Sequence, residues 1–258
     1  MDQEIVERLL ALNRAFYADF ARAFASSRLV DDPALTSILP YIPERARVLD
    51  VGCGNGRLAW LLDRERPGST YVGIDAVSEL IEVALAASGS LANVTAAFHV
   101  VDVARPGWGG APDLVAIQAT GTGAPEPSDP ARRFDCIVCL AVLHHIPSFD
   151  LRLRVVQEMA GLLAAGGTLV LSTWQFLSSA RMRRKIVEWG EVDVSEQALE
   201  PGDYLLDWKR GGRGLRYCHL VDEAEVRRLV ADSGLDVQET FRAGGREGNL
   251  SLFAILGR

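Results

Sequence analysis

The stretch Val48-Leu49-Asp50-Val51-Gly52-Cys53-Gly54-Asn55-Gly56 is the strongest structural signal in the sequence. A short apolar run is followed by three glycines at alternate positions. In the residues after them, up to Pro67, apolar side chains recur with the spacing of a helix. Glycines are needed where a backbone turns sharply and lets a ligand approach closely. The first N–H groups of the following helix favour an anionic ligand group. The stretch therefore predicts a buried strand, a ligand-binding turn and a helix.

Outward from this stretch, strand-like and helix-like segments alternate along the chain. This alternation predicts an α/β fold, in which a mostly parallel sheet with an antiparallel closing strand carries helices on both faces. We expect strands at residues 47–52, 70–75, 98–103, 134–142, 168–174, 236–243 and 250–256, and helices at residues 3–28, 57–66, 78–88, 151–167 and 221–234.

The expected domain organisation has two parts. Residues 1–45 are expected to form an N-terminal helical segment that covers the ligand site, and residues 46–258 form the main domain. An insertion on the substrate side is expected at about residues 175–216, where tryptophans and basic residues interrupt the alternation. The polar residues of the N-terminal segment that we expect to face the site are Asn13, Tyr17 and Arg28.

The glycine pattern separates two classes of nucleotide ligand. A dinucleotide fingerprint requires a third glycine at the position of Arg57. Asp50 would repel a pyrophosphate, whereas it suits the ammonium of a methionine moiety. The sequence VLDVGCGNG resembles motif I of the class I S-adenosylmethionine-dependent methyltransferases. That resemblance implies a Rossmann-like sheet and S-adenosyl-L-methionine (SAM) as cofactor.

Further cofactor contacts are expected at the ends of successive strands. Asp75 ends the second strand, where an acid can accept from both ribose hydroxyls. The family resemblance implies that Asp102 contacts the adenine amino group. The candidate cofactor-binding residues are Asp50, Gly52, Gly54, Asn55, Gly56, Asp75, Asp102, Val103, Leu140 and Ala141.

Later segments narrow the resemblance. LAVLHHIPSFDLRLRVVQEMAGLLAAGGTLVLSTW, GDYLLDWKRGG and RYCHLVDEAEVRRLV resemble the tRNA wobble-uridine carboxymethyl methyltransferases, which include the methyltransferase domain of human AlkB homologue 8. The resemblance implies esterification of a carboxymethyl group on a tRNA, and a small activator subunit as a partner. Cys218 stands where the family commonly has tyrosine, and Leu250 where eukaryotic members have tryptophan. The chain thus resembles a shorter, bacterial-type relative.

A carboxylate acceptor is already anionic at neutral pH, so it requires no general base. Arg216 is the residue we expect to hold it, because a guanidinium can bind a carboxylate through two parallel hydrogen bonds. Tyr217, His219 and His144 are the other candidate catalytic residues, with positioning roles.

Charge and composition leave the acceptor open. The net charge is −7, yet residues 181–185 carry four positive charges and residues 207–216 a net three. This pair of segments, which we call the basic lip, would suit a tRNA or an acidic small molecule. A methyltransferase acting on a carboxyl, hydroxyl or amine of a metabolite is therefore the alternative. A non-catalytic, SAM-binding scaffold subunit is the third class.

Other classes are disfavoured by the sequence. Cys136 and Cys139 have metal-like spacing but lie on one expected strand, where residues three apart point to opposite faces. The four histidines lack HxxxH spacing, so no metal is expected. No apolar run approaches the ~18–20 residues of a membrane span, and the start is not that of a signal peptide. We therefore expect no membrane partner and a cytoplasmic location.

Overall fold

The computed structural model describes residues 1–27, 32–110 and 133–258. Its main element is a seven-stranded sheet of order β3-β2-β1-β4-β5-β10-β9. The pairs β2–β3, β1–β2, β1–β4 and β4–β5 are parallel, whereas β10 is antiparallel to both β5 and β9. The predicted fold class is confirmed. The strands are β1 (Arg47–Val51), β2 (Thr70–Asp75), β3 (Thr95–Val100), β4 (Phe134–Leu140), β5 (Leu163–Trp174), β9 (Asp236–Ala243) and β10 (Ser251–Gly257).

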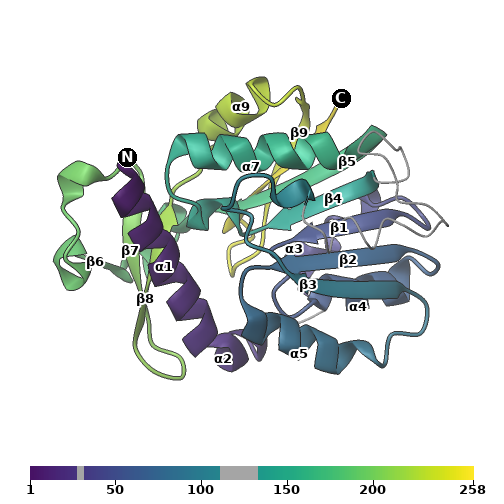
Figure 1. The fold of residues 1–258 in the computed structure, drawn as a ribbon, viewed down its shortest axis with the longest axis horizontal. Coiled ribbons are helices and arrows are strands. Elements are labelled where there is room, and N and C mark those ends of the chain that lie inside the picture. Colours follow the sequence, from purple (N-terminus) through teal and green to yellow (C-terminus); the bar gives the residue numbers. More distant parts are fainter. Residues whose placement is uncertain (28–31, 111–132) are drawn as a thin grey trace.

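Helices cover both faces of this sheet (Figure 1). One face packs against α3 (Pro33–Thr36), α4 (Arg57–Glu65) and α5 (Ser78–Ser88), and the other against α7 (Phe149–Leu162) and α9 (Glu223–Ala231). Each face has its own apolar core. Cys136 belongs to the first core and Cys139 to the second, so the two thiols lie on opposite faces of β4, as predicted.

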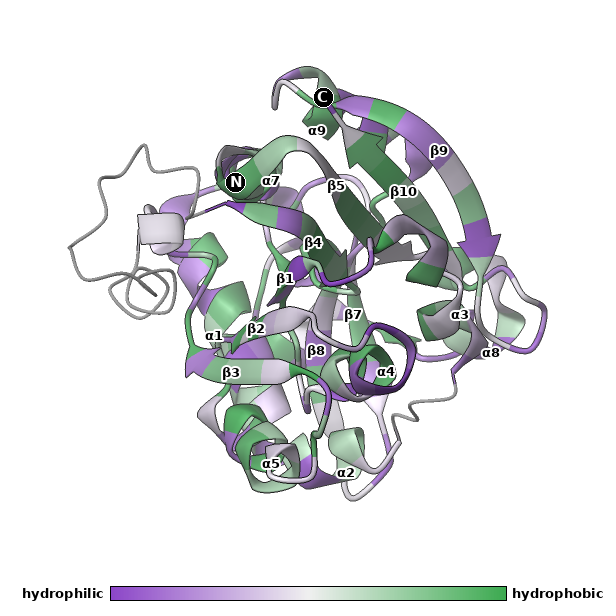
Figure 2. Ribbon diagram, turned by 90° about the vertical axis from the view of Figure 1, so that its right-hand side faces the viewer, coloured by the Kyte–Doolittle hydropathy of each residue, from purple (hydrophilic) through white to green (hydrophobic). Residues whose placement is uncertain are grey.

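The apolar residues are concentrated in the central strands. Figure 2 shows β4, β5 and β10 as mainly hydrophobic, whereas the edge strand β9 carries many hydrophilic residues. This difference follows the burial, since six of the seven residues of β10 are buried and those of β9 are exposed or half-buried. Polar residues on an edge strand discourage pairing with another chain.

A smaller antiparallel sheet lies beside the main one and consists of β6 (Ile186–Val187), β7 (Asp203–Trp208) and β8 (Gly214–His219). The helix α1 (Gln3–Asp19) runs between the two sheets, followed by α2 (Ala21–Ala25) (Figure 1). Short helical turns complete the described parts: η1 (Leu39–Tyr41), η2 (Trp108–Gly110), η4 (Leu143–His145), η5 (Phe176–Ser178), α8 (Ala180–Arg183), η6 (Trp189–Val192) and η7 (Glu196–Ala198).

Some predicted boundaries were wrong. The third strand, predicted at residues 98–103, spans Thr95–Val100. It pairs with β2 along its whole length, from Thr95 opposite Thr70 to Val100 opposite Asp75, so its bounds follow those of β2. The helix predicted to stop at two glycines ends at Leu162, because Leu163 is already fully buried in β5 beside Phe134. None of the described helices combines the length and apolar character needed to cross a membrane.

Candidate active site

A cavity lies at the carboxyl ends of β1, β2 and β4, between the glycine turn and α1. Gly52 and Gly54 have positive φ angles of +73° and +57°, which glycine adopts without strain. A Cβ on Gly52 would overlap Val142, whereas one on Gly54 would meet only Phe24, at 3.8 Å. Gly54 thus leaves room for a ligand. Nine of the ten predicted cofactor-binding residues line the cavity: Asp50, Gly52, Gly54, Asn55, Asp75, Asp102, Val103, Leu140 and Ala141.

Gly56, the tenth, has a packing role. A Cβ on this residue would lie 2.7 Å from the Phe98 ring, and its φ is +74°. The glycine therefore lets the turn rest on the side chains beneath it. For all ten residues, contact with a cofactor stays a prediction.

Asp50 is the buried acid at the floor of the cavity. Its side chain accepts a hydrogen bond from the Tyr71 hydroxyl at 2.7 Å. Burial raises the pKa of Asp50 to about 7, although the bond from Tyr71 and the charge of Arg57 oppose this shift. A buried carboxyl of this kind is ionised more readily when a cation binds beside it.

Asp75 is a second acid of the cavity, at the end of β2. The main-chain N–H groups of Gly54 and Val77 donate to its two oxygens at 2.9 and 3.0 Å. Burial nevertheless raises its pKa to about 6, because desolvation outweighs these bonds. Asp75 also lines the cavity, and each carboxylate oxygen can accept a further hydrogen bond, which suits a ligand with neighbouring hydroxyl groups.

Asp102 lies two residues beyond β3, and its carboxylate is held on the cavity wall. It forms an ion pair with Arg14 of α1 at 3.0 Å and accepts from the Ala104 N–H at 3.0 Å. The N-terminal helix therefore contacts an acid that is predicted to face the adenine.

Asn13 connects α1 to η4 and β8 through hydrogen bonds. Its amide nitrogen donates to the carbonyls of His145 and Tyr217, both at 3.2 Å, and its oxygen accepts from the Tyr217 N–H at 2.9 Å. Leu10, Asn13, Arg14 and Tyr17 of α1 all line the cavity. Arg28, the third predicted member, lies outside the described residues.

A profile of the methyltransferase domain family matches residues 20–240. The chain belongs to the methyltransferase domain family. As a member of this family, the protein is a SAM-dependent methyltransferase, and SAM is its cofactor.

Relatives of the methyltransferase act on different acceptors. It is 25% identical over 234 residues to a tRNA (carboxymethyluridine(34)-5-O)-methyltransferase of Schizosaccharomyces pombe, covering 86% of this chain and 88% of the relative. It is 28% identical over 198 residues to a ubiquinone biosynthesis O-methyltransferase of Paracidovorax citrulli, covering 75% and 65%. The structure of a magnesium protoporphyrin IX methyltransferase of Synechocystis with bound S-adenosylhomocysteine (SAH) has a TM-score of 0.60 at 18% identity, covering 96% and 99%.

The cavity of the methyltransferase fits this cofactor chemically. A buried acid, Asp50, is available for an ammonium group, and Asp75 can accept from ribose hydroxyls. The space at Gly54 is open next to both. Apolar side chains such as Leu80 and Val101 supply walls for a flat base.

Arg216 lies behind the α1 wall of the cavity, in β8. Its guanidinium carbon is 4.7 Å from the Trp174 ring centre, 5.2 Å from that of Phe16 and 5.3 Å from that of Trp208. Nη1 donates to the Tyr17 hydroxyl at 3.3 Å, while Nε is buried and has no hydrogen-bond partner among the residues that the structure describes. Arg216 is thus a buried cation in an aromatic box, one hydrogen bond from the cavity.

The two histidines of η4 differ in position. His144, the predicted one, is fully buried; its ring stacks on Trp174 with centres 4.8 Å apart, and it does not line the cavity. His145 lines the cavity, and its Nε2 lies 2.7 Å from the Tyr17 hydroxyl. The structure therefore places His145, and not the candidate His144, at the cavity.

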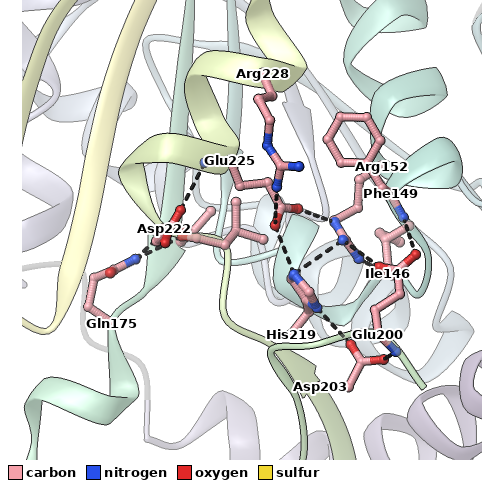
Figure 3. Close-up of polar contacts among 12 residues, drawn as sticks. Ile146, Phe149, Arg152, Gln175, Glu200, Asp203, His219, Asp222, Glu225 and Arg228 are labelled. Carbon is pink, nitrogen blue, oxygen red and sulfur yellow. Dashed lines mark hydrogen bonds and ion pairs between the residues drawn. The ribbon is translucent and has the colours of Figure 1, made fainter. Parts of the chain in front are cut away.

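His219 lies in a buried polar network (Figure 3). Tyr217 joins the same network, and neither residue lines the cavity. The Tyr217 hydroxyl donates to Asp203 at 2.7 Å, and Asp203 also contacts His219 Nδ1 at 2.6 Å. His219 Nε2 faces Glu225 at 2.9 Å. These bonds hold β8 and suit positioning of the strand more than contact with an acceptor.

Arg152 is the centre of this network. It is 1% exposed and donates to Glu225 at 2.7 Å, to Glu200 at 2.9 Å and to the Ile146 carbonyl at 2.9 Å. One side chain thus connects α7, α9 and the segment after η4 to the network that holds β8 (Figure 3).

Glu200, Asp203 and His219 are close enough together to resemble a metal site. The guanidinium of Arg152 lies among them, 2.9 Å from Glu200 and 3.2 Å from His219 Nε2. These ligand atoms are therefore already satisfied by protein groups.

Sequence reasoning missed several residues of the site. It expected Tyr17 to face the site but gave it no role at the acceptor, chose His144 and not His145 as a candidate catalytic residue, and did not mention Arg152. The pattern His144-His145 after a strand was the available signal for His145. No local signal distinguishes Arg152 from the other arginines of its helix.

Proposed function

We propose that the enzyme methylates a carboxylate oxygen, and that the carboxylate belongs to the carboxymethyl group of a tRNA wobble uridine. The guanidinium of Arg216 carries this proposal. It is 1% exposed, and no carboxylate in the described parts of the chain forms an ion pair with it. A buried cation without an anionic partner is costly, even between aromatic rings. Its place beside the cavity therefore favours a negatively charged acceptor.

The chemistry of such an acceptor matches the residues present. SAM supplies a methyl group on a sulfonium, and an ionised carboxylate can accept it without losing a proton. The protein must align the acceptor and exclude water. Asn13 and Tyr17, with His145 opposite them, provide a polar wall for this purpose.

Two observations support tRNA as the acceptor. The name of the Schizosaccharomyces pombe relative gives this substrate, and the match covers most of both chains. The basic lip exposes Arg181, Arg183, Arg184 and Arg210, and Lys209 is 82% exposed. Exposed cations of this kind bind phosphates and release counterions.

A small carboxylic acid is the second candidate acceptor. The part of the cavity next to Arg216 favours this candidate, because α1 covers it: Arg216 lies behind Tyr17, and residues of α1 form part of the cavity wall. A small acid needs less open space there than a nucleotide of a tRNA. The Paracidovorax citrulli relative is named for a biosynthetic reaction on a small molecule. The chain's net charge of −7 agrees with this alternative.

Nucleoside mass spectrometry tests the proposal. The enzyme, with SAM, is incubated with tRNA that carries 5-carboxymethyluridine at the wobble position. We expect the methyl ester to form, and to form much less with Arg216→Met, while Arg210→Ala serves as a control for loss of a lip charge. Binding of the tRNA should weaken steeply as salt increases. Absence of ester, with SAH binding intact and an activator subunit supplied, would reject tRNA as the acceptor.

A further inference from the structure

Arg216, Tyr17 and His145 form a hydrogen-bonded chain that ends at the cavity. Arg216 Nη1 donates to the Tyr17 oxygen at 3.3 Å, and that oxygen lies 2.7 Å from His145 Nε2. Tyr17 and His145 both line the cavity, whereas Arg216 lies behind them. Of the three groups, the Tyr17 hydroxyl is therefore the one placed to meet an acceptor while the Arg216 charge acts on it.

The other side of His145 defines its tautomer. Nδ1 lies 3.0 Å from the main-chain carbonyl oxygen of Tyr217, and a carbonyl can only accept. Nδ1 therefore carries a hydrogen. In the neutral ring Nε2 then has a lone pair, so it accepts a hydrogen bond from the Tyr17 hydroxyl. The Tyr17 oxygen, in turn, is left with lone pairs for the Arg216 N–H.

This arrangement is unsuited to a carboxylate until a proton moves. A carboxylate only accepts hydrogen bonds, so Tyr17 must turn its single proton from His145 towards the acceptor. With a neutral His145 that carries its hydrogen on Nδ1, neither Nε2 nor the Tyr17 oxygen would then have a hydrogen to place between them, so two lone pairs would repel each other. Moving the ring hydrogen to Nε2 would break the bond to the Tyr217 carbonyl. Protonation of the ring leaves both bonds intact.

We propose that the Tyr17 hydroxyl donates a hydrogen bond to the acceptor carboxylate, which stays ionised, and that His145 takes up a proton from solvent when this acceptor binds. The inference rests on the proposed function, because it requires a carboxylate acceptor. Tyr17 is then a catalytic residue that touches the acceptor. His145 supplies a positive charge through it, and Arg216 supplies a second one.

The groups around His145 are consistent with this coupling. Tyr17 comes from α1, while Arg216 and Cys218 come from β8, with Cys218 Sγ 3.7 Å from Nδ1. Burial raises the pKa of Cys218 to about 12, so its thiol is neutral. The His144 ring lies 4.3 Å from that of His145. Arg216 opposes a charge on His145 in the free protein, and an acceptor carboxylate removes this opposition.

Proton uptake can be measured without turnover. The probe is an anticodon stem-loop RNA with 5-carboxymethyluridine, titrated into the enzyme with saturating SAH. Calorimetry at about pH 8, where an ordinary histidine is neutral, is repeated in buffers of different ionisation enthalpy. We expect uptake approaching about one proton per site, and affinity that falls up to about tenfold per pH unit. His145→Gln and Tyr17→Phe should abolish the uptake, whereas His99→Gln and Tyr41→Phe should not.

The outcomes separate this inference from the proposed function. Ester formation on tRNA together with binding but no proton uptake would overturn the inference alone. Failure of the wild-type enzyme both to bind the probe and to form ester would overturn the two together. Nitrogen NMR of the free protein gives a test that needs no acceptor. A resonance pattern with hydrogen on Nε2 of neutral His145, and none on Nδ1, would also overturn the inference.

Discussion

The Tyr71 hydroxyl donates a hydrogen bond to the Asp50 carboxylate at 2.7 Å, and both side chains are buried beneath the cavity. The pair connects the beginning of β2 to the end of β1. Burial raises the pKa of Asp50 to about 7, so its carboxyl is partly protonated near neutral pH in the free protein. A ligand ammonium beside it would favour the carboxylate, which couples binding to proton release.

Cofactor affinity should therefore rise with pH. Between about pH 5.5 and pH 7, we expect SAH to bind more tightly by up to about tenfold per pH unit. Tyr71→Phe should move this dependence to higher pH, because the Tyr71 bond lowers the pKa of Asp50. Titration calorimetry at several pH values measures both effects. Affinity that stays constant over this range would show that no cation meets Asp50.

The glycine turn should respond differently at its two positions. Gly54→Val should abolish measurable SAH binding with the fold retained, because its side chain enters the open cavity space. Its positive φ adds a strain of roughly 1–2 kcal/mol. Gly52→Ala should lower the melting temperature more, since its Cβ overlaps Val142. Gly89→Ala, in open space with a φ of −61°, is the matched control. Normal SAH affinity in folded Gly54→Val would refute the site.

Much of the cofactor side could be predicted from the sequence because its determinants are local. The turn from β1 to α4 depends on neighbouring residues, and acids that follow parallel strands meet at one edge of the sheet. The acceptor side depends on distant pairs. Tyr17 and His145 are 128 residues apart, and Arg152 and Glu225 are 73 apart, so no local pattern joins them. Adjacent residues such as His144 and His145 also share every local signal, and only packing against Trp174 separates them.

Removing the charge of Arg216 should separate catalysis from cofactor binding. We expect Arg216→Met to lower methyl transfer about ten- to a hundredfold, which corresponds to roughly 1.5–3 kcal/mol for a charged hydrogen bond. SAH affinity should change little, because Arg216 does not line the cavity. Methionine is the informative variant, since alanine would leave a space between Phe16, Trp174 and Trp208. Arg216→Lys should recover part of the activity. Equal losses in both measurements would place Arg216 beside the cofactor.

The network around His219 should make stability depend on pH. Its hydrogen bonds to Asp203 and Glu225 raise the pKa of His219 against desolvation and the charge of Arg152. A raised histidine pKa stabilises the fold fully below the unfolded value of about 6.5 and loses this contribution as pH rises through the folded value. The opposite holds for Glu225, whose pKa is lowered by His219 and Arg152, so its contribution disappears as pH falls.

Unfolding in urea at increasing pH checks this prediction. The free energy of unfolding of the wild type should fall more steeply above about pH 6.5 than that of His219→Gln. Arg152→Met should be the more damaging change, by about 3–5 kcal/mol, because it removes the guanidinium that pairs with the buried Glu225 and with Glu200. Arg227→Ala removes an exposed ion pair with Glu223 and should cost at most about 1 kcal/mol. Parallel pH profiles for the wild type and His219→Gln would mean that His219 is neutral in the native network, and that Arg152 alone balances its acids.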